Sequence, residues 1–310
     1  MDNSKINCIF AADFNRKTMI DNPFLTFGYE SPEYFCDREE ETRELIKLIT
    51  NGNNVTLISP RRMGKTGLIL HSFAQPELSP YYTFLVDIYA TKNIQELTFE
   101  MSKSIVARLM SAPRKALDTF LQIANSIKVG ISFDYAGIPS WNLQVGDIQK
   151  PLITLDEIFR YLEQADRPCI VAIDEFQSIA QYEEKNVEAT LRTYIQRCRQ
   201  TRFIFAGSQR SMMREIFTSP ARPFYQSTTT IPLYPITLEK YGEFASKLFA
   251  KYDKKIGLEA VEKIYEKFNG TTWYMQKVLN ELFANTKAGE ICMHQEMDRS
   301  IQHILKSNEG

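Results

Sequence analysis

This chain of 310 residues has few cysteines and histidines and a net charge close to zero, and each of these features argues against a class of protein. The five cysteines lie far apart without C-x-x-C spacing, which indicates neither a disulfide framework nor a zinc site. The three histidines, His71, His294 and His303, also lack metal-ligand spacing. With 37 Lys and Arg against 38 Asp and Glu, the net charge of -1 argues against a protein that coats nucleic acid by bulk electrostatics.

Long apolar runs and internal repeats are missing too. No stretch approaches the roughly 18 apolar residues of a membrane span, so we expect no membrane partner. The apolar run Ile9 to Ala12 is too short for the h-region of a signal peptide, and the scattered thiols fit a cytoplasmic setting. The composition, 44% hydrophobic and 24% charged, is that of a globular protein, and the length predicts one large domain plus a smaller one.

The apolar patterns change character along the chain. Short β-prone runs alternate with helical patterns as far as Leu233, and only helical patterns follow Pro235. This order predicts an α/β domain with a parallel sheet, followed by a helical domain. We expect strands at 55–58, 82–89, 169–173, 203–206 and 228–233, and helices at 39–49, 94–110, 238–252, 258–268 and 274–283.

One stretch inside the α/β region follows a different rule. Apolar residues alternate over 127–133 and again over 141–145, around a turn with Gly137, which predicts a β-hairpin insertion at about 125–150. The pair Thr154 and Glu157 has the spacing of a capping box, so we expect a helix to begin there.

The segment after the first expected strand resembles a phosphate-binding loop. It matches G-x-x-x-x-G-K-S/T at Gly64, Lys65 and Thr66, whereas Ser59 stands in place of the first glycine. Backbone N–H groups at a helix N-terminus bind polyphosphate, Lys65 reaches the β- and γ-phosphates, and the Thr66 hydroxyl ligates Mg²⁺. We expect a nucleotide triphosphate to bind the loop residues Ser59, Pro60, Arg61, Arg62, Met63, Gly64, Lys65, Thr66 and Gly67.

Two carboxylates follow the apolar run Cys169 to Ile173. Acids at the carboxyl end of a parallel strand lie where α/β sheets bind ligands. Asp174 is therefore a candidate Mg²⁺ ligand, and Glu175 is a candidate general base that polarises the attacking water. The alternative for Glu175 is a surface acid after the strand, but the phosphate loop upstream favours the catalytic interpretation.

Further catalytic candidates follow the next apolar run, 203–206. Ser208 is the candidate sensor of the γ-phosphate, with Gln209 as the alternate. Arg222 lies between two prolines and is a candidate arginine finger, acting in cis or in trans. The alternatives are an ordinary turn serine and a solvated loop arginine.

Several segments together are similar to one family. They are Asn22-Pro23-Phe24 with Gly28, Phe35 to Glu41, the phosphate loop, Ala172 to Phe176, Ala206-Gly207-Ser208, and Asn269 to Tyr274. In these segments the chain resembles the archaeal-type ATPase branch of the STAND class of P-loop NTPases, which are relatives of AAA+ proteins. The resemblance implies ATP rather than GTP, an ASCE-type sheet of order 5-1-4-3-2 and a helical lid.

The composition of the first 30 residues and the change of pattern near Pro235, with this resemblance, suggest a division of the chain. We expect an irregular arm over 1–30, a P-loop ATPase core over 31–235 and a helical lid domain over 236–310. The family's Gly-Gly-x-Pro lid signature is replaced here by Asn269-Gly270-Thr271-Thr272. The sequence stops at Gly310, where the family would begin a winged helix, so that module is not expected within it.

Three functions remain open from the sequence. The first is a slow, Mg²⁺-dependent ATPase that acts as a conformational switch, with turnover that depends on a partner. The second is a scaffold on which bound ATP orders the lid for a protein partner, and the third is a DNA-linked helper ATPase. Glu175 favours turnover, because a pure binder needs no base. We expect ATP and a protein partner; DNA is not indicated, and ATP-dependent self-association is left open.

Overall fold

The computed structural model describes residues 21–133 and 139–307. The described chain divides into two compact units. The first holds Ile46–Ile58 and Pro76–Ile231, and the second holds residues 21–45, Ser59–Gln75 and 232–307. Most of the expected arm over 1–30, and the expected turn at Gly137, lie outside the described residues. The domain limits at 31 and 235 stay a prediction.

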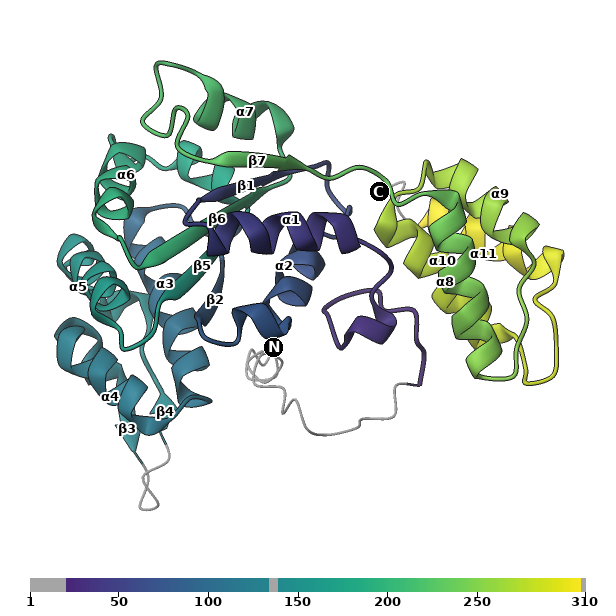
Figure 1. Cartoon of the computed structure of the whole chain (residues 1–310), viewed down its shortest axis with the longest axis horizontal. Coiled ribbons are helices and arrows are strands. Elements are labelled where there is room, and N and C mark those ends of the chain that lie inside the picture. The colour runs from purple at the N-terminus through teal and green to yellow at the C-terminus, as the bar shows by residue number, and fades with distance from the viewer. Residues whose placement is uncertain (1–20, 134–138, 308–310) are drawn as a thin grey trace. The chain divides into compact units, whose positions relative to one another are not determined.

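The first unit is built on a five-stranded sheet (Figure 1). Its order is β2-β5-β6-β1-β7. If these five strands are numbered 1 to 5 along the chain and the sheet is read from β7, the order is 5-1-4-3-2, as expected. The pairs β2–β5, β5–β6 and β6–β1 are all parallel. The α/β fold class is therefore confirmed. The strands are β1 (Val55–Ile58), β2 (Tyr82–Asp87), β5 (Cys169–Asp174), β6 (Thr201–Gly207) and β7 (Thr229–Pro232).

The centre of this sheet is buried on both faces. Every residue of β5 is buried, as expected for a parallel strand covered by helices on each side. Phe205 of β6 packs against Phe176, Phe217 and Phe224, with ring centroids 4.6, 5.3 and 5.5 Å away. These aromatic contacts brace the carboxyl ends of β5 and β6. The helices of this unit are α3 (Ile94–Met110), α4 (Arg114–Ile123), α5 (Pro151–Gln164), α6 (Val187–Arg197) and α7 (Arg210–Thr218).

Two helices of this unit begin in different ways, α3 with a side-chain cap and α5 with a proline. Helix α3 begins after Asn93, whose side chain accepts a hydrogen bond from the backbone N–H of Glu96 at 2.8 Å, a standard N-cap. The expected capping box at Thr154 is wrong. Pro151 starts α5 one turn earlier, since proline favours the first helical position, and Glu157 instead accepts a hydrogen bond from the Ser126 N–H.

The expected hairpin is present but short. Strands β3 (Ile131–Phe133) and β4 (Pro139–Trp141) pair antiparallel in a separate two-stranded sheet. Helix α4 and the 3₁₀ segment η4 (Asn125–Gly130) occupy the chain just before it. The other short 3₁₀ segments are η2 (Pro32–Tyr34), η3 (Pro76–Leu78), η5 (Val145–Asp147) and η6 (Phe176–Gln181).

The second unit contains a helical bundle with its own core. Phe24, which is fully buried, packs against Phe249 and Phe283 at 5.5 and 5.9 Å between ring centroids. Asn280 donates to the carbonyl of Phe24, so the segment before η2 is tied to the C-terminal helices. The bundle helices are α8 (Leu238–Lys251), α9 (Leu258–Phe268), α10 (Thr272–Asn285) and α11 (His294–Lys306), and this unit also holds α2 (Lys65–Phe73). Helix α1 (Glu39–Thr50) runs from one unit into the other.

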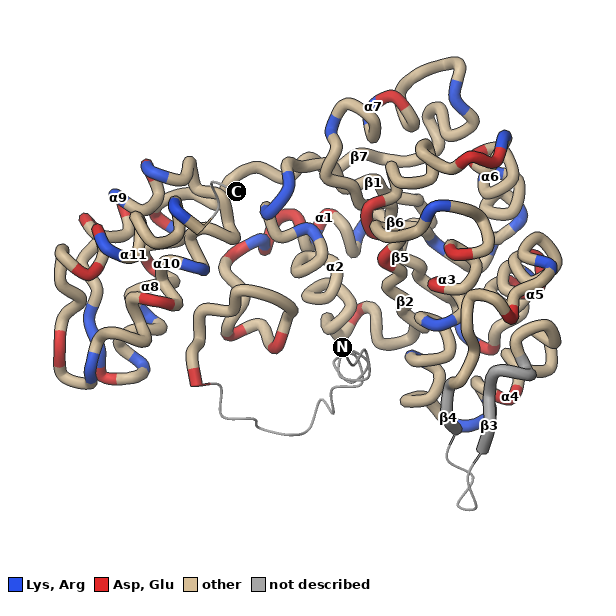
Figure 2. The backbone as a smooth tube through the Cα atoms, turned by 180° about the vertical axis from the view of Figure 1, so that it is seen from behind, with Lys and Arg blue, Asp and Glu red and all other residues tan. Residues whose placement is uncertain are grey.

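The distribution of charge is even. Figure 2 shows basic and acidic residues interspersed along the described backbone of both units. Among the described residues, no helix is both long and apolar enough to cross a membrane. The four cysteines in the described part, Cys36, Cys169, Cys198 and Cys292, are free thiols and buried.

Gly207, at the end of β6, gives a test of this packing. A Cβ built there would overlap Gln177 Oε1 and Met213 Sδ, so Gly207→Ala should lower the free energy of unfolding by about 1–3 kcal/mol through overpacking. Thermal and denaturant unfolding would measure the loss. Gly146→Ala is the matched control, because nothing lies within 4 Å of its Cβ position. Equal stability of the two variants would contradict the packing described for β6.

Candidate functional site

The phosphate loop runs from the end of β1 into α2. Gly64 is the N-cap residue of α2 and has a left-handed backbone, with φ of 85°, which favours glycine. Gly64 has no side chain to accept hydrogen bonds from the first-turn N–H groups of α2. A helix N-terminus of this kind attracts a phosphate, because its N–H groups and the helix dipole both favour negative charge.

Lys65 is the first residue of α2 and is 6% exposed. Its ammonium group donates to Ser59 Oγ at 3.3 Å and to the carbonyl of Pro60 at 3.4 Å. The lysine is therefore held over the start of the loop. Ser59, which stands where the usual pattern has glycine, thus adds an acceptor for Lys65, a role that the sequence pattern does not reveal.

The other loop residues differ in exposure. Met63 is buried, Gly64 and Gly67 are half-buried, and Thr66 is exposed. Pro60, Arg61 and Arg62 are also exposed residues.

The acidic pair lies at the end of the central strand β5. Asp174 is buried, and its Oδ1 accepts a hydrogen bond from the backbone N–H of Glu175 at 2.9 Å. Glu175 has φ of 54° and ψ of 40°, a left-handed conformation that is uncommon for a residue with a side chain. Such conformations persist where the surrounding structure enforces them, and they cluster at functional sites. The chain therefore turns sharply at Glu175 as it leaves the sheet.

Two neighbours converge on the Glu175 carboxylate. Oε2 accepts hydrogen bonds from the Ser208 hydroxyl at 2.7 Å, from the Ser208 backbone N–H at 3.3 Å, and from Gln177 Nε2 at 2.5 Å. Gln177 is 1% exposed. The structure thus brings together Glu175 and Ser208, and it adds Gln177, which the sequence reasoning missed. The only sequence signal for Gln177 is that it lies two residues after Glu175. The alternate, Gln209, is the N-cap residue of α7.

Arg222 lies in a network of acids within the first unit. Its guanidinium pairs with Glu188 of α6, and with Glu215 of α7 at 3.3 Å. Burial raises the pKa of Glu188, and the charge of Arg222 lowers it in part. In this structure Arg222 links α6 to α7, and the arginine-finger role stays a prediction.

A Mg²⁺ ion fits the donors available here better than a transition metal would. Among the residues that the structure describes, no three His, Cys, Asp or Glu residues gather into a metal cluster. Mg²⁺ prefers oxygen and keeps several waters, so it needs only one or two protein ligands beside the phosphates of a nucleotide. The Thr66 hydroxyl and the Asp174 carboxylate are each oxygen donors of the kind that this ion accepts.

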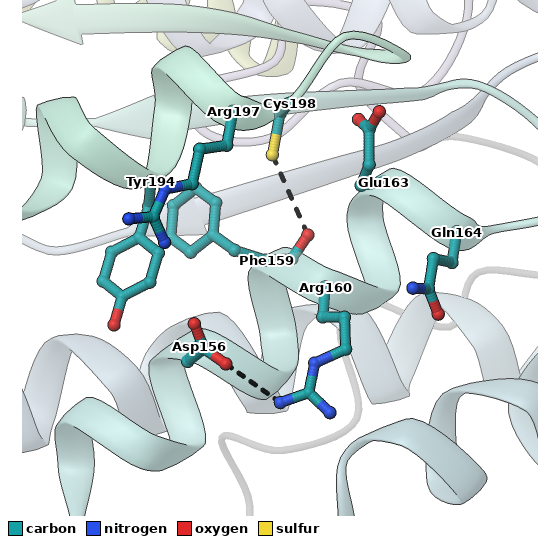
Figure 3. A pocket seen from close by; sticks show the side chains of 8 residues that line it. All are labelled: Asp156, Phe159, Arg160, Glu163, Gln164, Tyr194, Arg197 and Cys198. Carbon is teal, nitrogen blue, oxygen red and sulfur yellow. Dashed lines mark hydrogen bonds and ion pairs between the residues drawn. The ribbon is translucent and has the colours of Figure 1, made fainter.

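A surface pocket elsewhere in the first unit does not serve this chemistry. It lies between α5 and α6 and measures about 230 Å³, which is below the ~300–1,000 Å³ of typical ligand sites. Figure 3 shows that Arg160 donates a hydrogen bond to the Asp156 carboxylate and that the Cys198 thiol donates one to the carbonyl of Phe159. The stacked rings of Phe159 and Tyr194, with centroids 5.0 Å apart, form its wall. None of its lining residues is a predicted site residue.

The chain matches a known family over most of its length. A family model described as an ATPase domain predominantly from Archaea matches residues 35–278. The chain belongs to this ATPase family. It is therefore a nucleotide-binding ATPase, and the resemblance noted in the sequence is confirmed at the level of the family. No curated protein matches the chain.

Solved structures with low sequence identity share the fold of this ATPase. The Walker-type ATPase of Pyrococcus abyssi is 19% identical, with a TM-score of 0.65 over 92% of this chain and 75% of its own. The ORC1 protein of Aeropyrum pernix in complex with DNA is 11% identical, with a TM-score of 0.60 over 92% and 69%. The RuvB Holliday junction branch migration motor of Thermotoga maritima is 12% identical, with a TM-score of 0.51 over 88% and 71%.

The first prediction for this site concerns Lys65. Lys65→Ala removes a buried cation next to the loop, so affinity for ATP should fall by more than about tenfold, since a hydrogen bond to a charged group contributes about 1.5–3 kcal/mol. Titration calorimetry would measure it, and unfolding curves would show that the variant folds. Lys103→Ala, which changes a half-exposed lysine on α3, is the control. Equal ATP affinity for Lys65→Ala and the wild type would remove Lys65 from the site.

Proposed function

We propose that this ATPase is a slow, Mg²⁺-dependent hydrolase that works as a nucleotide-driven conformational switch. The observation that carries the proposal is the convergence of Ser208 and Gln177 on the Glu175 carboxylate at the end of β5. A carboxylate held in this way at the carboxyl edge of a parallel sheet suits a general base under control. The phosphate loop leaves β1 at the same edge, because Ile58 pairs with Gly207 in parallel strands.

The loop residues have distinct roles in this proposal. Backbone N–H groups between Ser59 and Gly67 bind the phosphates, and Lys65 neutralises charge on the β- and γ-phosphates. Thr66 and Asp174 hold Mg²⁺, which, when bound, supplies positive charge for the transferring phosphoryl group. Arg222 would act as an arginine finger and add positive charge at the transferring phosphoryl group, in cis or in a second copy of the chain. To do so it would have to break its ion pairs with Glu188 and Glu215.

Glu175 and Ser208 link hydrolysis to the presence of the γ-phosphate. While the donors occupy Oε2 of Glu175, that oxygen is poorly placed to accept a proton from water. A γ-phosphate that attracts the Ser208 hydroxyl would remove one of these donors and partly release the carboxylate. Turnover is slow in this scheme, because Gln177 keeps its own bond to the same oxygen.

Two other functions use the same pocket. A scaffold that binds ATP without turnover needs no base, so the placement of Glu175 argues for hydrolysis. A DNA-linked helper would need a basic surface, whereas charges of both signs are interspersed in each unit. The DNA in the ORC1 structure belongs to that protein, and here DNA is a ligand to be tested. A protein partner, a cytoplasmic location and membership of the STAND class complete the proposal.

The test of catalysis is Glu175→Gln. The carboxamide keeps the shape but accepts no proton, so binding should persist while the hydrolysis rate falls by about 10²–10⁴-fold. Phosphate release and ATP affinity would be measured together, with and without DNA. Glu183→Gln, an exposed glutamate in the same unit, serves as the control. Hydrolysis by Glu175→Gln at the wild-type rate would show that Glu175 is not the base.

The test of the switch uses the helical domain. A ligand stabilises the arrangement that it contacts best, so ATP with Mg²⁺ should protect amides in residues 236–306 from hydrogen exchange. It should also change the emission of Trp273, and a Trp141→Phe protein isolates that signal, because the chain has two tryptophans. Unchanged exchange at saturating ATP, in a protein shown to bind it, would rule out a switch in these helices.

A further inference from the structure

Two consecutive carbonyls of the phosphate loop are held from outside the loop. The carbonyl of Arg62 accepts a hydrogen bond from the backbone N–H of Trp273 at 3.0 Å. The carbonyl of Met63 accepts from Arg38 Nη2 at 3.2 Å and from Thr272 Oγ1 at 3.4 Å. All these residues belong to the second unit. The first turn of α10 and the buried Arg38 therefore fix the orientation of two peptide planes in the loop.

Fixing a carbonyl also fixes the amide that follows it. In a trans peptide the C=O and the next N–H point in opposite directions. Because the carbonyls of Arg62 and Met63 point at α10 and Arg38, the N–H groups of Met63 and Gly64 point away from them. These are the amides that a phosphate loop presents to its anion. The bonds from α10 thus act on the binding groups without touching the ligand.

The side chain of Arg62 strengthens this attachment. Its guanidinium carbon lies 4.2 Å from the ring centroid of Trp273 and 5.1 Å from that of Tyr274, and its Nη1 donates to the Tyr274 hydroxyl at 2.6 Å. Tyr274 is itself stacked on Phe268, with centroids 4.8 Å apart. A cation over aromatic faces is attracted by their quadrupoles.

The backbone of Arg62 makes such support necessary. Its φ is 68°, in the left-handed region that a residue with a side chain seldom adopts. A conformation of this kind persists when surrounding contacts enforce it. The contacts with Trp273 and Tyr274 supply that enforcement one residue before Met63 and two before Gly64.

We propose that Arg62, Trp273 and Tyr274 form a latch that holds the phosphate loop in its anion-binding conformation. Arg62 is then a positioning residue and neither a phosphate ligand nor a solvated charge. This inference rests on the proposed function in one respect, because it takes the anion bound by the loop to be the phosphate chain of ATP. It follows that α10 sets nucleotide affinity by ordering the loop before the ligand arrives.

The test compares Arg62→Ala and Tyr274→Phe with the wild type. Both variants should bind ATP and ADP about three- to tenfold more weakly, the range expected for losing one cation–π contact or one hydrogen bond. The ratio of ATP to ADP affinity should stay the same, because an ordered loop serves both nucleotides. Lys263→Ala and Tyr234→Phe, exposed residues of the second unit, are the matched controls and should bind as the wild type does.

Other patterns of affinity would overturn the latch. Loss of ATP affinity alone in Arg62→Ala, with Tyr274→Phe unchanged, would make Arg62 a direct γ-phosphate ligand. Wild-type affinities in both variants would show that the contacts do not order the loop.

A measurement without nucleotide separates this inference from the proposed function. In Arg62→Ala the amides of Met63 and Gly64 should exchange faster, and the emission of Trp273 should shift, while the unfolding temperature stays near that of the wild type. If the wild type binds neither ATP nor ADP, the proposed function fails, and these two readouts still decide the latch. Unchanged exchange at both amides would overturn it.

Discussion

The parallel pairing of β1, β6 and β5 is the constraint on which the proposed chemistry depends. Parallel strands all end at one edge, and the register sets Ile58 opposite Gly207 and Ile173 opposite Phe205. Residues that follow these strands therefore leave the sheet at the same edge, however far apart they are in sequence. The buried phenylalanines packed on Phe205 of β6 support this edge. Without that register, Ser208 would not meet Glu175, and the loop after β1 would not begin beside them.

Much of the fold could be predicted because its determinants are local. The helices 94–110 and 258–268 have the predicted limits, since their apolar residues repeat at helical spacing between clear caps and breaks. The strand order came from the family resemblance that the motifs carry, and not from periodicity. Helices α4 and α11 were missed, although the spacing of Met297, Ile301 and Ile304 is helical. Helix α4 has a similar stripe at Ala116, Leu117, Phe120 and Leu121, so the helical signal was present in both segments and was overlooked.

The sequence proposes the candidate site as a list of residues, whereas the contacts among those residues come only from the structure. The motifs point to Lys65 and Glu175, because phosphate and water activation require those residue types at those places. That the Ser59 hydroxyl accepts from Lys65 depends on how the loop is folded. Likewise, the bond from Gln177 to Glu175 depends on a left-handed turn that no periodicity encodes. Arg222 was chosen for its flanking prolines, while its pairing with Glu188 joins residues 34 positions apart.

The attachment of the phosphate loop to α10 has a consequence for how the chain acquires its structure. Met63 and Thr272, which share a hydrogen bond, are 209 positions apart. Closing so large a separation has an entropic cost, and non-local contacts of this kind slow folding. During synthesis the loop leaves the ribosome long before α10 exists. A nascent chain therefore carries the whole nucleotide motif in sequence while the carbonyls of Arg62 and Met63 still lack their bonds from α10.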